Sequence, residues 1–193
     1  MRRVSCLLLA LVGLTVGRYI EEVIAQIRLL AADDDLLRIS AENPGWKVER
    51  SADRRLIMTP PTGGESSRRN ARLTRLIDQW AETNGYIAFD SNAGFRLPDT
   101  SVVSPDAALV PRSTWEALAK RDRERIVRVI PTVAIELVSY SDEPAMLRTK
   151  LERLRTLGTS YVVLIDPYRE TIWTDGTPPE SFTLDFTQLL HPF

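Results

Sequence analysis

The chain has 193 residues, with 26 acidic and 25 basic side chains, one Cys and one His. Its length suits one domain, and its hydrophobic content of 44% is enough for a sizeable core. A single Cys excludes a disulfide framework or a thiolate zinc site, and a single His excludes a multi-histidine metal centre. Any bound metal must therefore have oxygen ligands, which favours magnesium or manganese. The net charge of −1 argues against a broadly basic nucleic-acid-binding surface, but not against a local basic groove.

The N-terminus differs from the rest of the chain, because Arg2-Arg3 precedes an apolar run from Val4 to Val16. A spanning helix needs about 20 apolar residues, so we expect no stable membrane insertion. The pattern is that of a secretory signal, but no Ala-x-Ala cleavage site follows it. An upstream start codon and a packed helix or strand are the alternatives. We treat residues 1–26 as an N-terminal apolar extension and 27–193 as the domain, and we expect a cytoplasmic protein.

The first predicted elements are a helix and a set of strands. An amphipathic helix is expected from Val23 to Leu30 with Leu36 and Leu37, and Asp33-Asp34-Asp35 is expected at a helix N-terminus or in a solvated turn. Hairpins are expected from 46–50 with 54–59 and from 86–90 with 94–97, followed by a strand over 102–110.

The other predicted helices and strands complete an α/β pattern. Helices are expected over 65–83, from the Ser113-x-x-Glu116 capping box to about Arg128, and over 144–157. Strands are expected at 132–139, 161–165, 170–174 and 182–186. Strand, helix and strand within 132–165 form a βαβ unit, which implies parallel pairing. The sequence therefore predicts one α/β domain with a mixed β-sheet core flanked by helices.

Two charged residues interrupt apolar patterns in the predicted βαβ unit. Glu136 lies on the same strand face as Ala134 and Val138, where an ionised carboxylate costs several kcal/mol unless a cation compensates. The alternative is a strand edge at which Glu136 meets water or an Arg. Lys150 projects inside a helical stripe of Met146, Leu147, Leu151, Leu154 and Leu157. Its ammonium either extends to water along the apolar stem or reaches an acidic pocket beside the sheet.

Two more acidic residues are candidates for the same pocket. Asp106 enters an apolar strand just after a Pro, where an Asp commonly hydrogen-bonds a turn. Glu65 begins the helix over 65–83 and lies nearly in line with Leu76, so it points toward the core edge; alternatively it only favours the helix dipole. Three carboxylates with one Lys suit hydrolysis of a phosphodiester by a hard divalent cation, which activates water and offsets charge on the phosphate.

Several motifs occur in the order found in a known family: Thr62-Gly63-Gly64-Glu65, Phe89-Asp90-Ser91-Asn92-Ala93-Gly94-Phe95, Ser104-Pro105-Asp106-Ala107, Ile135-Glu136-Leu137, Ser141-Asp142, Lys150 and Leu164-Ile165-Asp166-Pro167. Over residues 36–190 the chain resembles the Uma-two family of restriction-endonuclease-like proteins, a branch of the PD-(D/E)XK phosphodiesterase superfamily. The resemblance implies a restriction endonuclease-like fold and a metal-dependent nuclease.

The resemblance also implies roles for the candidate residues. Asp106 and Glu136 are expected to bind Mg²⁺ or Mn²⁺, with the carbonyl of Leu137 as a further ligand and Glu65 as the acidic residue of the first core helix. The superfamily has a Lys two residues after the Glu, where this chain has Val138. In the Uma-two branch that Lys lies on the following helix, in agreement with the inward phase of Lys150.

The expected function is therefore a divalent-metal-dependent endonuclease that hydrolyses DNA phosphodiester bonds. Arg68, Arg72 and Arg75 on one helix flank, with the Arg-rich stretch over 121–128, would contact phosphates unless they form a salt-bridged face. The alternative is a catalytically inert module of nuclease fold that binds nucleic acid or a protein partner. A homodimer fits the first function, because many relatives cut both strands as pairs.

Overall fold

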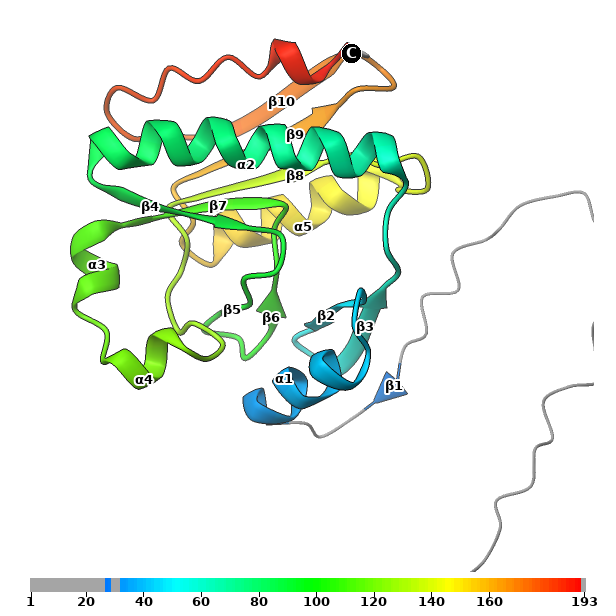
Figure 1. Cartoon of the computed structure of the whole chain (residues 1–193), viewed down its shortest axis with the longest axis vertical. Helices are drawn as coiled ribbons and strands as arrows, with labels where there is room; N and C mark the ends of the chain where they lie inside the picture. Colours follow the sequence, from blue (N-terminus) through cyan, green and yellow to red (C-terminus); the bar gives the residue numbers. More distant parts are fainter. Residues whose placement is uncertain (1–26, 29–31, 192–193) are drawn as a thin grey trace, which may run out of the picture.

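The computed structural model describes residues 27–28 and 32–191, so the predicted extension over 1–26 lies outside it (Figure 1). The predicted helix from Val23 to Leu30 with Leu36 and Leu37 is not continuous where it is described. Ile27–Arg28 form strand β1, and Leu36 and Leu37 lie in helix α1. The described strands form two five-stranded sheets, in the orders β10-β9-β8-β7-β4 and β1-β3-β2-β6-β5. Among these residues no helix is both long and apolar enough to cross a membrane.

The larger sheet contains the predicted βαβ unit. Its strands are β4 (Tyr86–Asp90), β7 (Ala107–Pro111), β8 (Val133–Leu137), β9 (Tyr161–Asp166) and β10 (Thr171–Gly176). β8 and β9 pair in parallel and are connected by helix α5 (Pro144–Thr156), as the sequence predicts. The other strand pairs of this sheet are antiparallel. The sheet is therefore mixed, with β8 at its centre.

Helices cover both faces of this sheet, with α2 (Gly64–Asn84) in front and α5 behind in Figure 1. Alternate residues of the strands face opposite helices, because successive side chains of a strand point to opposite faces. Leu109 and Ile135 pack with Leu73 of α2, whereas Ala134 and Val162 pack with Leu151 of α5. The α5 face of β8 therefore also holds Glu136, two residues after Ala134.

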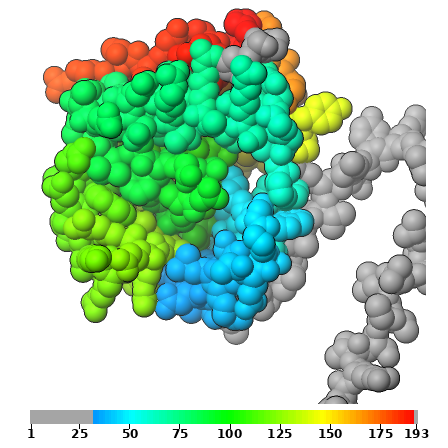
Figure 2. Space-filling view, viewed as in Figure 1, coloured from blue at the N-terminus to red at the C-terminus, as the bar shows by residue number. Residues whose placement is uncertain are grey.

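The smaller sheet contains the predicted hairpin of β2 (Lys47–Arg50) and β3 (Arg55–Thr59), together with β5 (Phe95–Arg96) and β6 (Val102–Val103). Helix α1 (Asp33–Glu42) packs against it through Leu36. The three aspartates form the first turn of α1, which confirms the predicted helix N-terminus. In Figures 1 and 2 the segment of α1, β2 and β3, in blue to cyan, lies below α2.

Two predictions about strands are wrong. The single strand over 102–110 is divided between β6 in the small sheet and β7 in the large one, because Pro105 has no N–H to donate to a ladder. The second hairpin does not form either. β4 pairs with β7, and β5 pairs with β6, because the turn at 91–94 leads the chain from one sheet to the other.

The remaining differences lie in irregular segments. The helix predicted from Ser113 is two short helices, α3 (Arg112–Glu116) and α4 (Lys120–Arg123), and no capping box forms at α3. Between them the Arg123 guanidinium donates to the carbonyl oxygens of Leu118 and Glu116, which a continuous helix would use itself. The strand predicted over 182–186 is irregular and leads into the 3₁₀-helix η1 (Thr187–Leu189), since its alternating apolar side chains pack against α2 without pairing to a strand.

Candidate active site

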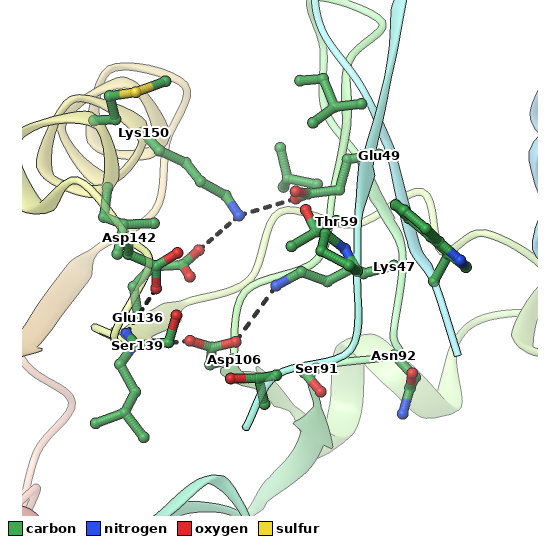
Figure 3. Close-up of a pocket in the computed structure, with 18 of the residues that line it drawn as sticks. Lys47, Glu49, Thr59, Ser91, Asn92, Asp106, Glu136, Ser139, Asp142 and Lys150 are labelled. Carbon is green, nitrogen blue, oxygen red and sulfur yellow. Dashed lines mark hydrogen bonds and ion pairs between the residues drawn. The ribbon is translucent and has the colours of Figure 1, made fainter. Parts of the chain in front are cut away.

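A cavity of about 640 Å³ lies where the two sheets meet α5. Asp106, Glu136 and Lys150 all line it, together with two residues of β2, Lys47 and Glu49 (Figure 3). These five side chains form the charged cluster. Strand β8, helix α5, the connection that leads into β7 and strand β2 of the small sheet thus supply charged groups to one pocket.

Asp106 and Glu136 approach each other because of strand register. The paired residues Ala107 and Ile135 are the last of the β7–β8 ladder, so Asp106 and Glu136 occupy the next opposed positions. At this point the Asp106 carboxylate takes the place of a ladder carbonyl, and its Oδ2 accepts a hydrogen bond of 2.9 Å from the Leu137 N–H. Pro105 therefore ends one ladder and leaves Asp106 at the junction, facing the carboxylate of the neighbouring strand.

Lys150 extends from α5 into the cavity and bridges two carboxylates. Its Nζ lies 2.7 Å from Glu136 Oε1 and 2.9 Å from Glu49 Oε1. Glu136 is 1% exposed, so its charge is compensated within the protein and not by water. The structure therefore shows Lys150 in an acidic pocket beside the sheet, and not extended to bulk solvent.

Lys47 forms the corresponding contact on the other side of the cavity. Its Nζ lies 3.4 Å from Asp106 Oδ1 and donates to the Ser104 carbonyl oxygen at 3.2 Å. The Ser104 N–H in turn donates to Glu49 Oε1 at 2.7 Å. Because Lys47 and Glu49 are alternate residues of β2, their side chains point to the same face, and the small sheet is joined to the large one through this cluster.

Burial and charge shift the pKa values of the cluster in different directions. Burial raises the pKa of the Glu136 carboxyl from 4.5 to about 7, although Lys150 opposes the rise; Asp106 and Glu49 add to it. For Lys150, burial alone would lower the pKa, but Glu136 and Glu49 outweigh it and raise the pKa above its ordinary value. For Glu49, burial would raise the pKa, but Lys150 and Lys47 hold it below its ordinary value. Of these three groups, Glu136 is therefore the one for which the effect of burial exceeds that of the neighbouring charges.

Burial would likewise lower the pKa of Lys47, but the nearby Asp106 carboxylate outweighs it and raises the pKa. Both lysines are therefore cations in the pocket.

Glu65 is not part of this cluster. Its side chain is exposed and pairs with Arg69 at 3.4 Å, outside the residues that line the cavity. The expectation that it points toward the core edge is wrong, because the inward face of α2 begins at Ser66 and continues through Arg69 and Leu73. Glu65 lies about 100° around the helix from Ser66, which turns it to the surface.

The predicted arginines also lie outside the cavity. Arg68 and Arg75 are exposed on α2 and Arg72 is half-buried. In the second group, Arg125 pairs with Asp34 at 3.3 Å and Arg128 pairs with Asp33 at 3.2 Å. This second group therefore belongs largely to a salt-bridged face, which is the alternative that the sequence left open.

Asp33 is the centre of that face. Its carboxylate accepts hydrogen bonds from Arg50, Arg96 and Arg128, at 2.9, 2.8 and 3.2 Å. Burial would raise its pKa, but Arg50 and Arg96 outweigh burial and lower it. The network joins the N-terminus of α1 to β2 and β5, so it stabilises the small sheet to which Lys47 and Glu49 belong.

Sequence reasoning missed Lys47 and Glu49. The available signal was the alternation of two charged residues on one face of β2, with Trp46, Val48 and Arg50 on the other. In a hairpin such a face is ordinarily solvated, so the alternation alone does not distinguish a water-facing side from one that lines a pocket. Their contacts depend on how the two sheets meet.

The donor set of the pocket suits a hard divalent cation. No His or Cys lines the cavity, and the described residues contain no cluster of three or more His, Cys, Asp or Glu side chains placed to hold a metal ion. Magnesium is commonly held by one or two carboxylates and keeps several waters. The opposed carboxylates of Asp106 and Glu136 meet that requirement, so the residues present fit Mg²⁺ or Mn²⁺.

The two-sheet α/β fold and its acidic pocket define a restriction endonuclease-like protein, and comparison with known proteins agrees. The chain belongs to the Uma2 family, described as "Putative restriction endonuclease", whose model matches residues 33–187. A crystal structure of a putative nuclease belonging to DUF820 from Anabaena variabilis is similar in fold, with a TM-score of 0.63. The two sequences are 18% identical, and the match covers 74% of this chain and 89% of that chain. No curated protein matches the chain significantly.

Proposed function

We propose that this protein is a divalent-metal-dependent endonuclease that hydrolyses phosphodiester bonds of DNA. The observation that carries the proposal is the convergence of Asp106, Glu136 and Lys150 in one pocket of a restriction endonuclease-like fold. A buried carboxyl group beside another carboxylate is costly for stability, and such groups are concentrated at functional sites.

Each residue of the cluster has a role in this proposal. Asp106 and Glu136 would hold Mg²⁺ or Mn²⁺, with the Leu137 carbonyl as a further ligand. The metal would lower the pKa of a bound water and offset charge on the phosphate. Lys150, which lies 2.7 Å from Glu136, would orient the attacking water or stabilise the charge of the transition state.

The residues of β2 would support this arrangement. Glu49 holds the Lys150 ammonium from the side opposite Glu136, which fixes its position. Lys47 lies beside Asp106 and places a second cation where a phosphate would approach. We include Lys47 and Glu49 in the proposed site and leave out Glu65, whose exposed side chain pairs with Arg69 outside the cavity.

The test is a plasmid-nicking assay with purified protein and Mg²⁺ or Mn²⁺, beside a sample that contains a chelator. We expect Glu136→Ala and Lys150→Ala to lose at least about 100-fold in rate, as is typical when a charge-stabilising group is removed. Lys120→Ala is the matched control, because Lys120 lies exposed on α4. Equal nicking by all four proteins would refute the assignment of the site.

The same assay addresses the alternative of an inert binding module. If wild-type protein binds the plasmid in a gel-shift measurement but nicks it with neither metal, hydrolysis is rejected and the fold serves for binding. The Lys47–Asp106 contact is the observation that favours this alternative, since one oxygen of the carboxylate already has a cation beside it. Contamination by another nuclease is excluded when Glu136→Ala, purified in the same way, is inactive.

A further inference from the structure

Exposed hydrophobic side chains gather at the mouth of the candidate active site. Five large hydrophobic residues are exposed in the described part of the chain: Leu37, Trp46, Tyr140, Met146 and Tyr168. Single exposed hydrophobic residues are common on protein surfaces, but a group of them around one cavity marks a binding surface. Two of the five, Trp46 and Met146, line this cavity, and Tyr140 adjoins residues that line it.

Trp46 and Met146 line the cavity directly. Tyr140 stands between Ser139 and Asp142, which both line it, and the ring of Tyr168 lies 6.3 Å from that of Tyr140 in an edge-to-face arrangement. We call these four residues the hydrophobic rim. The loop after β8 projects from the body of the molecule, in yellow at the edge of Figure 2.

The two tyrosines are held by ordered turns. Tyr140 follows β8 and Tyr168 follows β9, so both lie beyond the carboxyl ends of neighbouring parallel strands, where α/β folds commonly bind ligands. The Ser139 N–H donates to the Asp142 carboxylate at 2.7 Å, and the Tyr168 N–H donates to the Asp166 carboxylate at 2.9 Å. The rings are therefore presented to solvent by turns that are already fixed, which lowers the cost of binding a ligand.

Tyr140 is the most exposed member of the rim, at 89%. Its ring neighbour among the described residues is Tyr168, over which the Arg69 guanidinium lies at 5.9 Å from the ring centroid. An aromatic ring of this exposure contributes little to the folded core and offers a flat apolar face to a partner. Nucleobases stack on such faces, and Arg and Tyr are typical of surfaces that bind single strands.

The depth of the charged cluster limits which nucleic acid can reach it. Glu136 is 1% exposed and Asp106 is 9% exposed, so a phosphate must enter the cavity to approach them. A cavity of about 640 Å³ falls within the range of sites that enclose one small ligand. It has room for a nucleotide, whereas a base-paired duplex would have to open at this point.

On the basis of the proposed function, we infer that Tyr140 and Tyr168 form a stacking platform for an unpaired nucleotide of the DNA strand whose phosphate enters the cavity. The substrate class is then DNA with a single-stranded or locally opened segment. The platform binds the base by its π-face, so it discriminates unpaired from paired bases and not one base from another.

The test is fluorescence anisotropy with the full chain on a labelled 12-nucleotide oligothymidine and on a mixed-sequence duplex of the same length. Ca²⁺ is present, because it binds carboxylate oxygens and offsets the negative charge of the pocket. Loss of one stacked base weakens binding by about 10-fold in such sites, so we expect this loss for Tyr140→Ala with oligothymidine. Tyr140→Phe keeps the stacking face and should bind within about twofold of wild type. Leu37→Ala is the matched control, because Leu37 is an exposed hydrophobic residue on α1, outside the rim.

The outcomes separate this inference from the proposed function. Equal binding of oligothymidine by wild type and Tyr140→Ala overturns the platform, even if the plasmid is nicked. If Tyr140→Ala binds both DNAs more weakly than wild type and to the same extent, the platform is also overturned, because Tyr140 would then confer no preference for unpaired bases. Loss of single-strand binding in Tyr140→Ala, with Tyr140→Phe and Leu37→Ala unchanged, supports the platform even if no metal yields hydrolysis.

Discussion

Replacing Glu136 by Gln should make the protein more stable at pH 8 and change its stability little near pH 4.5. Burial raises the pKa of Glu136 from 4.5 to about 7, so the folded state resists ionisation of this group. The free-energy penalty of ionising Glu136 in the folded state is absent below pH 4.5. It grows between pH 4.5 and pH 7 and reaches about 3 kcal/mol there. Gln is never ionised, so at pH 8 we expect the variant to melt up to about 10 °C higher.

The matched control is Glu49→Gln, for which we expect the opposite change in stability. Lys150 and Lys47 hold the pKa of Glu49 below its ordinary value, so its ionised form stabilises the folded state above pH 4.5. That contribution is lost only as the pH falls through the lowered pKa. Glu49→Gln should therefore lower the melting temperature at pH 7–8, although both carboxylates contact the same lysine.

The assay is differential scanning fluorimetry of the three proteins between pH 5 and pH 8.5, without added metal. The informative quantity is the difference in melting temperature between each variant and wild type at each pH. If Glu136→Gln lowered the melting temperature at every pH, or raised it equally at pH 5 and pH 8, the buried charge would not be the source of the effect. The inference that this carboxylate is retained for function at the expense of stability would then be refuted.

Three further changes test the structural reasoning. Asp33→Asn should lower the free energy of unfolding by about 2 kcal/mol at pH 7 in urea titrations, with a smaller loss in acid, because its arginine partners lower its pKa. Lys150→Met should cost about 3–5 kcal/mol in the same titrations, since it leaves Glu136 buried without its nearest cation, and Glu136→Gln should recover part of this loss. Gly176→Ala should lower the melting temperature by several degrees, because a Cβ there would lie 2.2 Å from the Ser160 carbonyl oxygen.

The βαβ part of the site could be predicted because its signals are local. Glu136 interrupts an apolar strand and Lys150 interrupts an apolar helical stripe, and the short connection of the βαβ unit brings strand and helix together. The same periodicity placed Met146 inside the stripe, whereas the structure leaves it 62% exposed at the cavity mouth. Helical phase thus identifies the side of a helix that faces the sheet, but not the point along it where the sheet ends.

The remainder of the site depends on contacts between the two sheets, which no local pattern reports. Lys47 contacts Asp106 across 59 residues of sequence, and Glu49 contacts the Ser104 N–H across 55. The feature that arranges these contacts is Pro105, which divides one apolar run into strands of different sheets. The sequence shows a Pro in a strand, but the partners of the two halves follow only from the assembled fold.

The charge of the cluster argues for the proposed chemistry. When all five groups are ionised, the three carboxylates exceed the two lysines by one negative charge, in a pocket where Glu136 is 1% exposed. A phosphodiester, itself an anion, would be repelled from such a pocket. One divalent cation reverses the net charge to +1, which matches the single negative charge of the phosphodiester. The excess of one carboxylate therefore favours a site that takes up a metal ion with its substrate over one that binds the phosphate through lysines alone.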